Sequence, residues 1–308
     1  MAEPLSRPLS AAELCEIMRG ARAFDASRLD RILRVDEDRG LVEVQASVTW
    51  RSLAERLRPG DAQAGAARTT LPTVGESLAW NAAGPDGRPA VTHVESITLV
   101  TPEGELRRVS RVANAELFAL AVGGHGLFGA PYSVTLRIES LARAVSDGAA
   151  SPPKRMPRDA LRLLVPPEAL AGFLTAARQR CGEWRVAIEA EAVRATRAEA
   201  ETFLRWARRD YAEVTLLLTR RGNLGSSLKA MQVRRELIDL AIAAGGAFHI
   251  ACTPEATREQ TEACYPQLRR FLAEKRRFDR HERLVNAWYR RQRALLLAEP
   301  ERSSYNAP

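Results

Sequence analysis

Two glycine-rich segments in the first half of the chain, residues 71–84 and 121–130, carry the residue types best suited to ligand chemistry. Glycine has no Cβ, so the backbone N–H groups of such segments can approach a phosphate closely. Between them, residues 94–109 predict a strand–turn–strand unit, and residues 114–122 predict a short helix capped by Asn114. Two glycine-rich loops around one hairpin indicate a nucleotide cradle.

His249 is the candidate catalytic residue in the second half of the chain. An imidazole with a pKa near neutrality can take a proton from a substrate at physiological pH. A single histidine on an alternating strand is also a common buried structural group, and both interpretations stay open. His125, inside the second glycine-rich segment, and His93, at the start of a strand, are expected to pack or to hydrogen-bond the backbone.

Length and hydropathy limit the class of protein. The 308 residues are enough for roughly two domains. No run of about 18 apolar residues predicts a membrane span. The first ten residues lack the apolar core of a signal peptide. We therefore expect a cytoplasmic protein without a membrane span.

Charge and cysteine content argue against two further classes. The net charge is +8, but nearly all of the positive charge is arginine, spread along the chain and not interleaved with aromatic residues. No nucleic-acid partner is therefore expected. The four cysteines form no CxxC pair, and no histidine stands at ligand spacing from them. We expect neither a metal site nor a disulfide framework.

The apolar periodicity predicts an α+β fold in two parts. In the first part, strands are predicted at 41–46, 94–100, 106–109 and 131–138, and helices at 49–57 (capped by Thr49) and 114–122. In the second part, strands are predicted at 161–165, 186–193, 214–219 and 248–251, and helices at 166–180, 224–244, 257–265 and 267–278. Residues 141–157, rich in Ala, Ser, Gly and Pro, form the predicted boundary. We expect the second part to be one sheet covered on one face.

Several segments, taken in their order, resemble a known family. The segments 29–36, 44–50, 73–75, 93–106 and 114–129 are similar to the PCMH-type FAD-binding domain of the vanillyl-alcohol-oxidase-like FAD-linked oxidases. The second half resembles a bacterial branch of that family in segments 203–208, 235–243, 256–260, 263–266 and 275–290. The resemblance covers most of residues 25–293.

The resemblance implies the domain organisation and the cofactor. It implies a PCMH-type FAD-binding domain over 1–145 with an incomplete first subdomain, an α+β cap or substrate domain over 155–275, and a tail, 276–308, that packs back on the FAD domain. A non-covalent FAD is implied, because the usual His or Cys linking loop is absent. The residues implied to contact it are Thr73, Val74, Gly75, Ser77, Asn81, Gly84, Gly123, Gly124 and Gly126. The implied chemistry is hydride transfer from a small hydroxylated substrate to the flavin, which makes the protein a flavoprotein oxidoreductase.

The chain departs from the family at the cofactor site. The first pyrophosphate loop of the family has no counterpart, since only residues 21–23 separate the opening helix from the segment that follows it. Glu76 replaces the second glycine of the usual motif. Aimed at a pyrophosphate about 4 Å away, this carboxylate would cost about 4 kcal/mol at an effective dielectric constant near 20; turned outward, it would cost far less. Trp80 stands where relatives have a small residue, either filling space left by a lost isoalloxazine or serving as a core residue.

Three functional interpretations stay open. The first is an FAD-linked oxidoreductase. The second is a pseudoenzyme of the same fold, with weakened or lost FAD binding, that acts as a binding or regulatory protein. The third is the product of a shortened gene that folds poorly because a sheet edge is left unpaired.

Overall fold

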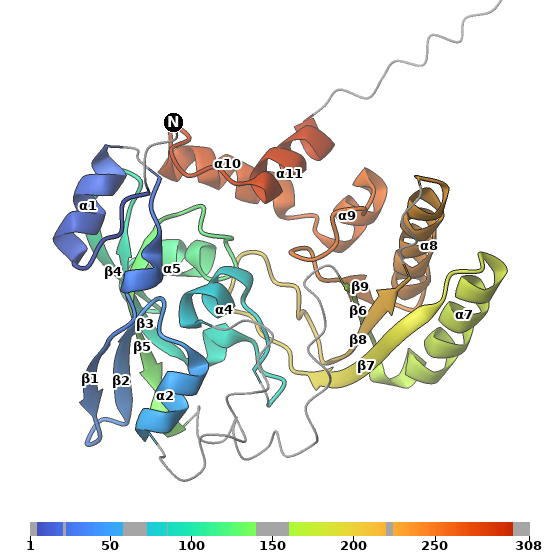
Figure 1. The fold of residues 1–308 in the computed structure, drawn as a ribbon, viewed down its shortest axis with the longest axis horizontal. Coiled ribbons are helices and arrows are strands. Elements are labelled where there is room, and N and C mark those ends of the chain that lie inside the picture. Colours follow the sequence, from blue (N-terminus) through green and yellow to red (C-terminus); the bar gives the residue numbers. More distant parts are fainter. Residues whose placement is uncertain are drawn as a thin grey trace, which may run out of the picture.

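The computed structural model describes residues 5–20, 23–57, 73–84, 86–139, 160–219 and 224–297. Within them the chain forms two antiparallel sheets with helices packed around each (Figure 1). The α+β expectation is confirmed. The predicted boundary at 141–157 and positions 21 and 22 of the shortened N-terminal connection lie outside the described residues.

The first sheet has the strand order β1-β2-β5-β3-β4. Its strands are β1 (Ile32–Asp36), β2 (Leu41–Gln45), β3 (Val94–Val100), β4 (Leu106–Ser110) and β5 (Ala130–Arg137). The alternation of buried and exposed side chains sets the register of this sheet. Val44 of β2 and Ile97 of β3 both pair with Val134 of β5, and all three side chains are buried. The helices of this part are α1 (Ala11–Arg19), α2 (Trp50–Leu57), α4 (Val74–Trp80) and α5 (Ala115–Ala121), with 3-10 turns at Ala26–Arg28 and Ala90–His93.

The second sheet has the order β7-β8-β6-β9. Its strands are β6 (Leu161–Val165), β7 (Ile188–Thr196), β8 (Tyr211–Leu218) and β9 (Ala247–Phe248). The 3-10 turn Pro167–Ala169 leads into α7 (Leu170–Glu183), which packs with α8 (Leu224–Ala243) on the side away from the first sheet (Figure 1). The opposite face of the second sheet is therefore turned toward the first part of the molecule.

The last helices are α9 (Arg258–Cys264), α10 (Leu268–Phe278) and α11 (Ala287–Leu297). The segment that follows α10 reaches the first part of the chain. Arg283 donates to the carbonyl of Pro102 at 3.0 Å, and the amide of Asn286 donates to the carbonyl of His125 at 2.9 Å. The domain limits at 145, 155 and 275 stay predictions.

Four sequence expectations need correction. Residues 74–80 of the first glycine-rich segment form a helix rather than a loop. The strand expected at 248–251 ends at Phe248, so His249 follows the strand. Asn114 holds the N-cap position of α5, but its side chain donates to the carbonyl of Arg108 and does not cap the helix. Strand β1 and helix α11 were not predicted. The cap predicted at Thr49 is confirmed by its hydrogen bond from the N–H of Ser52.

No helix within the described ranges is both long enough and apolar enough to cross a membrane.

Candidate functional site

Four ionisable side chains gather on the face of the second sheet that is turned toward α4. Glu213 on β8 pairs with Arg194 on β7 in the sheet register, and Arg162 on β6 pairs with Thr215, two residues along β8. Residues two apart on a strand share a face, so all three charged residues lie on one face. His249 joins them, because its N–H donates to the carbonyl of Arg162 at 2.9 Å. We call Arg162, Arg194, Glu213 and His249 the junction cluster.

Glu213 is the buried anion of the junction cluster. Its side chain is 1% exposed, and its Oε2 accepts from Nε and Nη2 of Arg194 at 2.7 and 2.6 Å. Burial alone raises the pKa of Glu213, but the charges of Arg194 and Arg162 outweigh it, and the pKa lies below the ordinary value. The carboxyl group is therefore ionised at neutral pH.

Two buried polar atoms of the cluster have no hydrogen-bond partner within the described structure, namely Nε of Arg162 and Oε1 of Glu213. The closest charged approach between these residues is 3.6 Å, from Nη1 of Arg162 to Oε1 of Glu213. This separation is too long for a good hydrogen bond. Buried polar atoms are nearly always paired, so these two are exceptions within the described structure.

His249 is a buried neutral imidazole. Burial lowers its pKa to about 4, against a partial opposing effect from the charge of Glu213. Its Nδ1 faces Sγ of Cys252 at 3.8 Å. Burial raises the pKa of the Cys252 thiol to about 11, so this cysteine is protonated and unreactive at neutral pH.

Aromatic rings connect the junction cluster to α4. The ring of Trp206 lies 4.8 Å from that of His249, and the ring of Trp80 lies 6.4 Å from it. Nε1 of Trp206 donates to the carbonyl of Asn81 at 3.1 Å, and Nη1 of Arg194 donates to the carbonyl of Ala83 at 3.2 Å. We call this contact region between the end of α4 and the second sheet the junction.

The structure brings the two glycine-rich segments together, as the sequence predicts. The N–H of Gly123 donates to the carbonyl of Leu78 at 2.8 Å, and the N–H of His125 donates to that of Ala79 at 2.9 Å. His125 also stacks on Trp288 with ring centroids 3.9 Å apart, and burial lowers its pKa to about 3. The expected packing role of His125 is confirmed.

The predicted cofactor contacts on α4 bond to the chain itself. The N–H of Val74 donates to Val48, and that of Gly75 donates to the carbonyl of Ala46 at 2.7 Å. The hydroxyl of Thr73 caps the helix by accepting from the N–H of Glu76, and that of Ser77 accepts from Nε1 of Trp50 at 2.8 Å. A Cβ on Gly75 would lie 2.8 Å from the carbonyl oxygen of Ala46. This glycine is therefore required by a close backbone approach.

The remaining predicted contacts divide into buried and open positions. Asn81 is fully buried at φ 48°, accepts from the N–H of Val91 and donates to Glu199. A Cβ on Gly124 would lie 2.0 Å from the carbonyl oxygen of Leu120, again a packing requirement. Gly84 lies beside Asp86 and His93, whereas Gly126 is exposed, at φ 72°, with open space around it. As cofactor contacts, these positions and those on α4 stay predictions.

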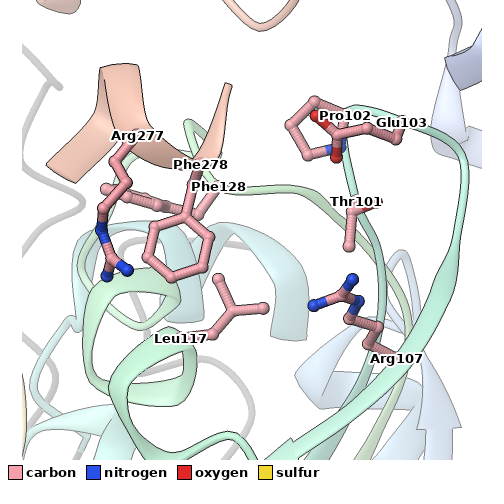
Figure 2. A pocket seen from close by; sticks show the side chains of 8 residues that line it. All are labelled: Thr101, Pro102, Glu103, Arg107, Leu117, Phe128, Arg277 and Phe278. Atoms are coloured by element: carbon pink, nitrogen blue, oxygen red, sulfur yellow. The ribbon is translucent and has the colours of Figure 1, made fainter. Parts of the chain in front are cut away.

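A pocket lies between the β3–β4 turn, α5 and the end of α10 (Figure 2). It has a volume of about 200 Å³ and an apolar wall that includes Leu117 and Phe278. Arg107 and Arg277 face it from two sides, but each already pairs with a glutamate, at 2.6 Å in both cases. Both guanidinium groups that face the pocket therefore already have a carboxylate partner.

The comparison with protein families identifies the first part of the chain. Residues 8–110, from just before α1 to the end of β4, match the family model of an FAD binding domain. The cofactor that this match indicates is FAD, and the match supports an FAD-binding oxidoreductase type of protein. No curated protein matches the chain.

The described residues show no preformed contact for FAD at the two places considered. At the junction, the aromatic rings of Trp80 and Trp206 already lie against His249. At the glycine-rich segments, the N–H groups of Gly75 and Gly123 already donate to carbonyls of the chain. A pyrophosphate held by these two groups requires that both bonds open.

Sequence reasoning missed Arg162, Arg194 and Glu213. The signal was present for two of them, because Arg162 and Glu213 are single charges inside otherwise apolar strands. A buried charge in a strand points to a partner or a site. The sequence did not show that these strands are neighbours, which is what brings the charges together.

Proposed function

We propose that the protein is an FAD-linked oxidoreductase of the vanillyl-alcohol-oxidase-like type that oxidises a small hydroxylated substrate at the junction. The single observation that carries this proposal is the junction cluster itself, a group of ionisable side chains, buried except for Arg194, that faces the FAD binding domain. When bound, FAD supplies the acceptor for the hydride that leaves the carbinol carbon. The chain's own residues bind the substrate and take its proton.

His249 is the proposed base. With a pKa of about 4 it is neutral at pH 7 and can accept a proton. In the tautomer that carries its proton on Nδ1, next to Sγ of Cys252, Nε2 is the nitrogen that takes the hydroxyl proton of the substrate. The charge of Glu213 raises the pKa of His249 and so stabilises the imidazolium that forms.

The aromatic residues of the junction keep water out. Trp206 is 2% exposed and is fixed by its hydrogen bond to Asn81, so its ring covers His249 from the side of α4. A site without water strengthens the interaction between Glu213 and the developing imidazolium.

The test is an absorbance spectrum of the purified protein with and without added FAD, followed by anaerobic reduction with candidate alcohols. We expect flavin absorbance and its bleaching by substrate. His249→Gln should retain flavin and lose about 10²–10⁴-fold in reduction rate, whereas His281→Gln, at an exposed position, should match the wild type. Colourless protein that takes up no FAD would favour the pseudoenzyme alternative.

A further inference from the structure

We propose that Asn81 is a positioning residue of the junction, which fixes the connection between β7 and β8 against the end of α4 and so sets the ring of Trp206 on His249. This β7–β8 connection is the segment from residue 197 to residue 210. The inference deepens the proposed function, and it rests on that function in taking His249 as the base.

Both polar atoms of the Asn81 side chain are bonded to the chain, and the residue is fully buried. Its Oδ1 accepts from the N–H of Val91 at 2.9 Å, and its Nδ2 donates to Oε1 of Glu199 at 3.3 Å. Its carbonyl accepts from Nε1 of Trp206 at 3.1 Å. One residue therefore ties the FAD binding domain to two points of the β7–β8 connection.

Glu199 is the buried carboxylate at the first of these points. Within the described residues, its oxygens accept from four neutral donors, which are the N–H of Glu201, the N–H and the hydroxyl of Thr202, and the amide of Asn81. Three of these donors belong to the turn that Glu199 itself starts, and only Asn81 lies across the junction. Removing a donor from a buried carboxylate is costly, because the oxygen has no water to replace it.

Trp206 is the second point, and it carries the effect to His249. Its ring is 2% exposed and lies 4.8 Å from the imidazole. The β7–β8 connection also makes two backbone bonds to the first part of the chain, from the N–H of Arg197 to Gly87 and from that of Phe203 to Ala119, both at 2.8 Å. Asn81 holds the part of the connection that leads to Trp206, so its loss should let the ring move and water reach His249.

A simpler role for Asn81 is that of an ordinary helix cap. It follows α4 with φ 48° and ψ 42°, the left-handed conformation in which Gly and Asn commonly end helices. A cap of this kind depends on the backbone conformation and not on the partners of the side chain. Variants that keep the conformation and change the side chain therefore separate the two roles.

An exchange of the two side chains tests the bond between Asn81 and Glu199. Asn81→Asp places a second carboxylate against the first, and Glu199→Gln makes an N–H meet an N–H in either orientation of its amide. The double variant restores one donor and one acceptor at the net charge of the wild type. We expect each single variant to lower the melting temperature and the double variant to recover most of the loss. A double variant no more stable than either single variant would contradict the proposal.

The titration of His249, followed by NMR on the full-length protein without FAD, tests the positioning itself. The histidine signal that disappears in His249→Gln assigns the resonance, and the expected wild-type pKa is about 4. Asn81→Gly keeps the left-handed backbone and adds no charge. It should raise the pKa of His249 by at least about one unit, because water then reaches the imidazole. The double variant should titrate as the wild type does.

Asn114→Gly is the matched control for this titration. Asn114 also has a left-handed backbone, at φ 51°, and its exposed side chain makes one hydrogen bond, to the carbonyl of Arg108. This variant should leave the pKa of His249 unchanged. An unchanged pKa in Asn81→Gly would overturn the proposal: Asn81 would then be a helix cap if FAD binding is also unchanged, and a cofactor contact if FAD binding is weakened.

The proposed function and the positioning role fail in different ways. Protein in which Asn81→Gly raises the pKa of His249, but which takes up no FAD, retains the positioning role and loses the oxidoreductase function. Protein that holds FAD and is reduced by alcohols, but whose His249 titrates identically in Asn81→Gly, retains the function and loses the positioning role.

Discussion

The glycine-rich segments and the junction cluster both contact α4 and differ in how their polar groups are satisfied. At the start of α4 and along its partner segment, the N–H groups of Gly75 and Gly123 bond to carbonyls of the chain. At the far end, Arg162 and Glu213 each keep a buried polar atom without a partner. Gly75 and Gly123, which a motif selects, are therefore bonded internally, whereas Arg162 and Glu213, which no motif selects, each keep one unpaired polar atom within the described structure.

The contrast teaches that glycine content and ligand contact are separate properties. Gly75 and Gly124 stand where backbone passes so close that a Cβ would collide with a carbonyl oxygen. Their small size serves the packing of α4 against β2 and of the loop against α5. Unsatisfied buried atoms are the better guide to a ligand, because native proteins rarely leave them unpaired.

Removing the anion of the junction cluster should have the largest effect. Glu213→Ala leaves Arg162 and Arg194 without a counterion, and we expect it to lower the free energy of unfolding by about 3–5 kcal/mol. Glu191→Ala on β7 is the matched control, since it breaks an ion pair whose arginine is 58% exposed and should cost less than about 1 kcal/mol. Urea unfolding of both variants gives the comparison. Equal losses would show that the cluster is not a buried ionic network.

Acid should destabilise the protein through His249 and His125, whose pKa values lie below the ordinary value. The pKa values of His249 and His125 in the folded protein are about 4 and about 3, below the ordinary value of about 6.5. Below pH 6.5 the unfolded chain therefore binds more protons than the folded protein does. The stability that is fully present above pH 6.5 is lost as the pH falls toward the folded-state pKa values of the two histidines. The titration of His249 alone lowers the free energy of unfolding by about 3 kcal/mol between pH 6.5 and pH 4.

Urea unfolding at several pH values from 7 to 4 measures the slope of the free energy of unfolding against pH. His249→Gln should flatten it by the contribution of one proton, and the exposed His281→Gln should leave it unchanged. A slope unaffected by His249→Gln would mean that the imidazole is accessible to water, contrary to its 3% exposure.

Glycine substitutions test whether the first region serves packing or a ligand. Gly124→Ala places a Cβ 2.0 Å from the carbonyl oxygen of Leu120 and should cost about 1–3 kcal/mol of stability. Gly172→Ala, inside α7 with open space around it, should stabilise the protein by about 0.5–1 kcal/mol. Thermal unfolding of the two variants should shift in opposite directions. If the Gly124→Ala protein has normal stability but binds FAD more weakly, Gly124 contacts the cofactor and is not required for packing.

Much of the sheet architecture follows from the alternation of apolar and polar residues along the strands, because a shift of the pairing register by one residue would turn the buried side chains outward. Strands β2 to β5 were predicted for this reason. Strand β1 was missed because its residues are only partly buried at the sheet edge, which weakens the pattern. Helix α4 was taken for a loop because of its glycine, although Thr73 caps it and Val74 and Leu78 are buried beneath it.

The candidate site was harder to predict than the fold. His249 was selected by residue type alone, and the structure adds its neighbours and its burial. The grouping of Arg162 with Glu213 depends on β6 and β8 being neighbours, although about 50 residues of sequence separate them. No local pattern encodes that pairing, because it depends on contacts between distant segments.

The smallest expected effect tests whether the junction behaves differently from the interior of the FAD binding domain. Trp206→Phe removes the hydrogen bond to the Asn81 carbonyl across the junction, and Trp50→Phe removes the one to Ser77 within the domain. Each should cost about 1 kcal/mol. Only Trp206→Phe should also change the rate of FAD uptake in stopped-flow fluorescence, because Trp206 holds α4 to the second sheet beside the proposed site of substrate oxidation. Equal uptake rates for the two variants would place the entry path away from the junction.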